Sequence, residues 1–77
     1  MYKKYECRMI GFDHQSEVRK LAEVLNYLAN YIPRGVIVKE VKTDVTLTVI
    51  FLVKESDCDF VIGMKSRFPK CEIKEGL

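Results

Sequence analysis

The sequence of 77 residues contains few of the residue types that build reactive centres. It has one histidine, no tryptophan and three cysteines, none of them in a C-x-x-C spacing. A single histidine, His14, is too few for a cluster of histidine ligands, and three scattered cysteines form neither a zinc site nor a disulfide framework. We therefore expect no metal and no other cofactor.

Glycine and proline are also scarce, and neither sign of charge dominates. Four Gly and two Pro accompany 48% hydrophobic and 31% charged residues, a composition that excludes disordered and collagen-like chains. Thirteen Lys and Arg against eleven Asp and Glu leave a formal charge of +2, too small to indicate a nucleic-acid-binding arm or an acidic mimic of DNA. A chain of this length has room for one core, so residues 1–77 are expected to form a single domain.

Long apolar runs are missing as well. The most apolar segment, Val45–Val53, contains two Thr and is much shorter than the ~20 residues of a membrane span. The first residues, MYKKYECR, carry charges where a secretory signal needs an apolar run. From the sequence we expect a cytoplasmic protein without a membrane partner.

What is present is an alternation of strand and helix patterns. Four segments have the two-residue alternation or the β-branched content of strands, and two have apolar residues three and four positions apart. The β-α-β-β-α-β order of these segments is typical of the α+β ferredoxin-like sandwich, a four-stranded antiparallel sheet of strand order 4-1-3-2 with two helices on one face. The predicted elements are a strand around Lys4–Met9, a helix over Ser16–Tyr31, strands over Val36–Val41 and Val45–Lys54, a helix over Ser56–Phe68 and a strand over Lys70–Glu75.

The pairing of the two middle strands depends on where Lys39 points. Val45, Val49 and Phe51 belong to the more apolar side of the second of these strands, which is expected to face the core. A three-residue loop would bring Lys39 to that side, whereas a loop of even length pairs Val38 with Val49 and turns Lys39 outward. Burial of an unpaired ammonium costs several kcal/mol, so we expect the even loop.

Two sets of residues are candidates for chemistry. Asp13 and His14 could form an acid–base pair before the first helix, but adjacent side chains seldom face each other and the spacing supplies no nucleophile. Cys7 and Cys71 are expected to face the core from neighbouring strands, either as a redox pair or, as we favour, as thiols that pack as small hydrophobes. Cys58 lies where a helix dipole favours a thiolate, but its two acidic neighbours oppose this effect. We expect no catalytic residue and no enzyme activity.

Surplus apolar side chains indicate a binding surface. Tyr27 and Tyr31 are expected on a flank of the first helix together with Val24, because the core side of that helix is predicted to centre on Leu25 and Val18. Tyr is favoured in protein interfaces. Further apolar residues are expected to point away from the helices on the open face of the sheet: Ile10, Ile37, Ile50 and Leu52. The leading hypothesis is therefore a non-catalytic protein-interaction or regulatory module, of adaptor or inhibitor type, that self-associates as a homodimer.

An alternative function is nucleic-acid binding by the same face of the sheet. Lys4, Arg8 and Lys39, together with outward Thr residues, would contact the phosphate backbone. The outward positions predicted on the two central strands include no aromatic residue on which a base could stack. The mode of binding typical of RNA-recognition motifs is therefore not expected.

A further alternative comes from a resemblance. The segment Asp13–Ile37 (DHQSEVRKLAEVLNYLANYIPRGVI) is similar in residue types to the loop, helix and return strand of ACT-type regulatory domains. Those domains usually carry Pro-Gly before the helix, where this chain has Gln15-Ser16. The resemblance implies a sensor of a small ligand at a dimer interface.

Overall fold

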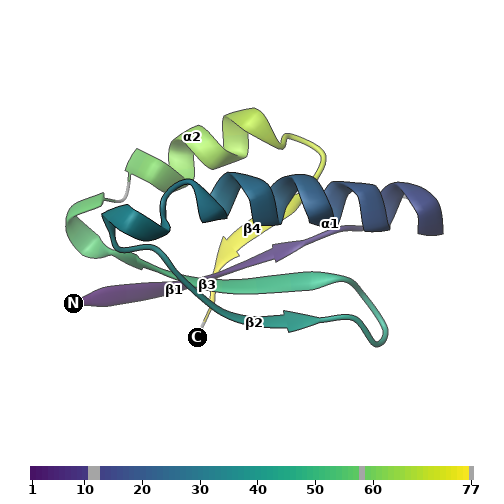
Figure 1. The fold of residues 1–77 in the computed structure, drawn as a ribbon, viewed down its shortest axis with the longest axis horizontal. Coiled ribbons are helices and arrows are strands. Elements are labelled where there is room, and N and C mark those ends of the chain that lie inside the picture. Colours follow the sequence, from purple (N-terminus) through teal and green to yellow (C-terminus); the bar gives the residue numbers. More distant parts are fainter. Residues whose placement is uncertain (11–12, 58, 77) are drawn as a thin grey trace.

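A four-stranded antiparallel sheet carries two helices on one of its faces, and the described residues place no helix on the other face (Figure 1). The computed structural model describes residues 1–10, 13–57 and 59–76. The protein is a small α+β domain, as the sequence predicts. In chain order its elements are β1 (Tyr2–Arg8), α1 (His14–Ala29), the 3₁₀ turn η1 (Ile32–Arg34), β2 (Ile37–Lys42), β3 (Thr48–Lys54), the 3₁₀ turn η2 (Glu55–Asp57), α2 (Asp59–Arg67) and β4 (Glu72–Glu75).

The strands lie in the order β2-β3-β1-β4, so β1 and β3 are central while β2 and β4 are edges. This is the predicted 4-1-3-2 order read from the other edge. Cys7 of β1 pairs with Val49 of β3 on one side and with Ile73 of β4 on the other. Residues directly opposite each other share a face of the sheet, so the odd-numbered residues of β1 and β3 point toward the helices.

The first turn of α1 is bonded by the aspartate that precedes it. The Asp13 carboxylate accepts hydrogen bonds from Ser16 N at 2.9 Å and from Ser16 Oγ at 3.1 Å. The bond from the Ser16 backbone, followed by that from its hydroxyl, lowers the pKa of Asp13. Because this cap pairs an otherwise free amide, α1 begins at His14, earlier than the predicted Ser16. Beyond α1, Gly35 closes η1 at a φ of 101°, a left-handed conformation that favours glycine.

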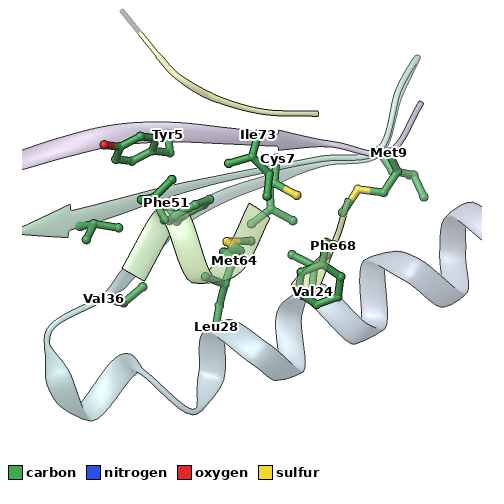
Figure 2. Packing of buried hydrophobic residues seen from close by; sticks show 14 residues of the cluster. Tyr5, Cys7, Met9, Val24, Leu28, Val36, Phe51, Met64, Phe68 and Ile73 are labelled. Carbon is green, nitrogen blue, oxygen red and sulfur yellow. The ribbon is translucent and has the colours of Figure 1, made fainter. Parts of the chain in front are cut away.

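The core lies between the sheet and the two helices (Figure 2). Each layer contributes side chains with no exposed surface, among them Cys7, Phe51, Leu28 and Met64. The side of α2 predicted to be apolar is the side that packs into the core, and it consists of Phe60, Val61 and Met64, with Phe68 directly after the helix.

The helix α1 is rotated about its axis relative to the prediction. Val24 has no exposed surface, whereas Val18 is 50% exposed. The reason is that α1 packs against α2 as well as against the sheet: the ring of Tyr27 lies 5.8 Å from that of Phe60. The buried side of α1 therefore centres on Val24 and Leu28. The expectation that Val24 lies on a partner-binding flank is wrong, because its side chain is inside the core.

The strand β2 contains a β-bulge that the sequence analysis did not consider. Val38 pairs with Phe51, and regular pairing resumes at Glu40, which leaves Lys39 as an extra residue. The predicted pairing of Val38 with Val49 is wrong. An inserted residue reverses the alternation of side chains along the rest of the strand. Lys39 is therefore exposed although the loop after β2 does not have the predicted even length.

Two valines of α1 give a matched test of this rotation. Val24→Ala removes two methyl groups from a fully buried side chain, so we expect the free energy of unfolding to fall by about 2 kcal/mol from lost burial and the cavity that remains. Val18→Ala truncates a half-exposed side chain on the same helix and should change that free energy by about 0.5 kcal/mol or less. Urea denaturation of both variants measures the difference. A larger loss for Val18→Ala would restore the rotation predicted from the sequence.

Candidate functional site

On the open face of the sheet, opposite the helices, side chains form rows that run across the strands. In each row β3 supplies the middle residue, and β1 and β2 supply its neighbours. Thr48 and Ile50 of β3 therefore have a charged side chain on each side, whereas Leu52 has the apolar Ile37 on one side. The three rows that span β1, β3 and β2 are Lys4–Leu52–Ile37, Glu6–Ile50–Glu40 and Arg8–Thr48–Lys42, and Lys74 and Glu72 of β4 extend the second and third of these rows.

Accessible apolar surface gathers at one end of the open face. Ile37 is 43% exposed and its neighbour Leu52 is half-buried. Tyr2, which pairs with Lys54 one row beyond Leu52, is 45% exposed. Tyr2 is not among the residues predicted for this face, because two lysines follow it and the strand was expected to begin at Lys4. We call Tyr2, Ile37 and Leu52 the apolar end.

Only part of the predicted open-face cluster is accessible as one surface. Ile50 is 6% exposed, since it lies in the middle of the sheet with a glutamate on each side in its row. Ile10 is 41% exposed, but it lies six residues beyond Lys4, the β1 partner of Leu52. Six residues of strand span about 20 Å. The structure therefore brings Ile37 and Leu52 together, separates Ile10 from them and buries Ile50.

Several charges of the open face are paired with one another. Arg8 Nη1 and Lys74 Nζ each lie 3.6 Å from Glu72 Oε1. Lys4 is half-buried, and Lys39 lies at the exposed bulge of the edge strand. The three basic residues predicted for nucleic-acid binding, Lys4, Arg8 and Lys39, thus do not form one continuous patch, and Arg8 has a carboxylate partner.

A second candidate site is an open cavity of about 550 Å³ between the C-terminal part of α1 and the start of α2. Its aromatic wall comes from α1, from α2 and from Tyr31, which follows α1: the ring of Tyr31 lies 4.7 Å from that of Phe60 and 5.1 Å from that of Tyr27. The sequence analysis did not find this cavity, because it depends on how the two helices meet. The polar part of its lining consists of Arg34, Ser56, Asp57 and Asp59.

Tyr27 and Tyr31 are therefore wall residues of this cavity rather than a free flank of α1. Both are half-buried and pack against the core. Burial, and after it the neighbouring Tyr31 hydroxyl, raises the pKa of Tyr27. Both tyrosines thus pack against Phe60 of α2, and a role of these tyrosines in binding a partner stays a prediction.

The contacts of Tyr31 predict a loss of stability on truncation. Tyr31→Ala removes a half-buried ring with two aromatic neighbours, so we expect the free energy of unfolding to fall by about 2 kcal/mol. Tyr31→Phe keeps the ring and should change that free energy by about 1 kcal/mol or less. Thermal and urea denaturation of both variants test this. An Ala variant as stable as the Phe variant would mean that the ring is a free surface.

Cys7 and Cys71 lie next to each other on the helix side of the sheet. Cys7 has no exposed surface, Cys71 is half-buried, and neither is in a disulfide. Burial, with a smaller contribution from Cys71, raises the pKa of Cys7 from 9.0 to about 12. Burial also raises the pKa of Cys71. Because the thiolate is the reactive form, these shifts favour packing over redox chemistry at neutral pH. Cys58 lies outside the described residues.

The other residues considered for chemistry are not assembled into a reactive group. The carboxylate of Asp13 is bonded to Ser16, and His14 is exposed at the first residue of α1. Among the described residues, no group of three or more His, Cys, Asp or Glu side chains could hold a metal ion. Gly11 and Phe12, which precede Asp13, lie outside the described residues.

The raised pKa of Cys7 predicts how stability depends on pH. The unfolded thiol ionises near its ordinary pKa of 9.0 and the folded one near 12, so between these values the unfolded state binds fewer protons. The free energy of unfolding should therefore fall as pH rises above about 9, by up to about 1.4 kcal/mol per pH unit from this group, with no such effect at lower pH. Cys7→Ala should show a smaller fall between about pH 8 and pH 10 in urea denaturation. An identical fall in both proteins would assign it to other groups.

Comparisons of the chain with models of known protein families, with curated proteins and with solved structures find no match. No helix in the described part of the chain is both long and apolar enough to cross a membrane. The surfaces described above are therefore the basis for a function.

Proposed function

We propose that the protein is a small, non-catalytic protein-interaction module that binds another protein through the open face of its sheet and also self-associates. The observation that carries the proposal is the apolar end, where Tyr2, Ile37 and Leu52 lie together on a surface that no described helix covers. Scattered exposed apolar residues are ordinary, whereas a cluster of them marks a contact surface.

The charged side chains around the apolar end suit this function. Glu6 and Glu40 lie in the next row, and Arg8 and Lys42 lie in the row beyond it. Protein interfaces commonly have an apolar centre within a polar rim, and the rim charges select the partner and its orientation. The partner is therefore expected to present an apolar side chain to Leu52 and charges of both signs to these rows.

The proposed fold class is the ferredoxin-like sandwich. The order of elements, the strand order β2-β3-β1-β4 and the position of both helices on one face support this assignment. The two 3₁₀ turns, η1 and η2, lie in the connections before β2 and before α2 and do not change the order of the main elements.

Nucleic-acid binding has weaker support than protein binding. The formal charge is +2, and Arg8 is already paired with Glu72. The open face has one aromatic side chain that the sequence analysis did not place there, Tyr2, and it stands at the end of β1 rather than in the middle of the sheet. Stacking of successive bases would need more than one such platform.

A substitution in the apolar end tests the proposed function. Leu52→Lys places a charge at the centre of this surface and should weaken binding of the partner at least about tenfold, as loss of an interface anchor does. The partner is first identified by co-purification with the tagged wild-type chain from its native host, and binding is then measured by calorimetry with purified proteins. The matched control is Val45→Lys, because Val45 is 95% exposed in the loop before β3. Equal binding by wild type, Leu52→Lys and Val45→Lys would refute a role of the open face.

A further inference from the structure

The outer edge of β2 is the longer of the two strand edges of the sheet. β2 has six residues and β4 has four. Five of the six β2 side chains are exposed, and the strand lies along one side of the sheet in Figure 1. The outer edge of a terminal strand presents backbone groups that can pair with another strand. A second chain could therefore extend the sheet here.

The bulge decides which symmetric pairing β2 can make with a second copy of itself. In a regular strand, side chains alternate between the two faces of the sheet. Two copies related by a two-fold axis can then match their faces only if the axis passes through one residue position, so that this residue lies opposite the same residue of the second copy. Glu40 is on the open face because it pairs with Ile50. Lys39 has no partner in β3, and we infer that it is on the same face, because alternation from Val38 leads there and its side chain is exposed. The two neighbours Lys39 and Glu40 thus share a face, which lets them lie opposite each other across a two-fold axis.

With the axis between Lys39 and Glu40, every pair consists of residues on the same face. Lys39 lies opposite Glu40 of the second copy, and symmetry forms this pair twice. Val38 lies opposite Val41, and both point to the helix side, since Val41 pairs with Val49. Opposite charges in directly opposed positions stabilise a strand pair, and like charges destabilise it.

We propose that two copies of this chain pair antiparallel through their β2 edges about this axis and form one continuous eight-stranded sheet. This inference rests on the self-association in the proposed function and names its interface. The two copies of the apolar end would then lie on one continuous open face. The interface is small, so the dimer is weak, with a dissociation constant in the micromolar range or above.

Lysines and bulges on edge strands can also prevent pairing with another strand. A strand edge that pairs differs from one that avoids pairing in the charges that its bulge brings opposite each other. Without the bulge, a symmetric pair centred on Lys39 would oppose two ammonium groups and would be repulsive. The bulge brings the adjacent Glu40 to the same face and replaces that repulsion with two attractive pairs. The combination of the bulge with the adjacent Lys39 and Glu40 therefore favours pairing of this edge rather than its protection.

Charge reversals test the pairing by sedimentation equilibrium over micromolar to millimolar concentrations. Lys39→Glu opposes carboxylates at both symmetric positions, and Glu40→Lys opposes ammonium groups, so each variant should raise the dimer dissociation constant at least about tenfold. The double variant Lys39→Glu/Glu40→Lys restores opposite charges and should dimerise like the wild type. An equimolar mixture of the two single variants should form heterodimers tighter than the dimers of either variant alone. Thermal melts check that all variants fold.

Two controls separate failure of this interface from failure of the proposed function. Lys74→Glu makes the same change of net charge on the β4 edge and should leave the dissociation constant unchanged. Leu52→Lys alters the open face and should also leave the dimer intact. If Leu52→Lys dissociates the dimer while the β2 reversals do not, the edge pairing is refuted and self-association uses the open face. A wild type that stays monomeric refutes self-association by either route, and binding of a different protein is then decided by the Leu52 and Val45 variants alone.

Discussion

The strand β3 has apolar side chains on both of its faces, and the burial of this strand governs the arrangement of the other elements. Val49, Phe51 and Val53 point to the helix side and have almost no exposed surface. Ile50 and Leu52 point to the other side, on which no helix of the described residues lies. The central position of β3 lets β1 and β2 flank it, and their long charged side chains border Ile50. At Leu52 this cover is incomplete, because its neighbour on β2 is the apolar Ile37, and the apolar end lies at this position.

The two helices meet through aromatic rings rather than through aliphatic side chains alone. Tyr27 of α1 and Tyr31, two residues after this helix, contact Phe60 of α2, and Tyr27 also contacts Phe68. The rings of Tyr27, Tyr31 and Phe60 also line the open cavity. In a small domain that has no disulfide among its described cysteines, these contacts supply stability that a larger core would otherwise provide. The tyrosines thus serve the fold and shape a surface at the same time.

The features that depend on local periodicity could be predicted from the sequence, and those that depend on contacts between distant elements could not. The alternation around Cys7 and the helical spacing of Val61, Met64 and Phe68 gave the elements and their buried sides correctly. The rotation of α1 escaped prediction because Val24 is buried by two neighbours, the sheet and α2, whereas periodicity reports only the average apolar direction. Periodicity is also insufficient for the candidate surfaces. It predicted that Ile37 and Leu52 lie on the open face. The burial of Ile50 between two glutamates and the position of Tyr2 in the apolar end depend on the register of the strands, which periodicity does not give.

The bulge at Lys39 also has a consequence for the evolution of this chain. The inserted residue is the only member of β2 without a partner in β3, and the residues on either side of it are already in register with Phe51 and Ile50. A shorter chain lacking this one residue would keep every other side chain of β2 on its present face. Homologues can therefore differ by a single-codon deletion here and retain the same core, so an alignment gap at this position would separate chains that share a fold but differ in the charge pattern of their sheet edge.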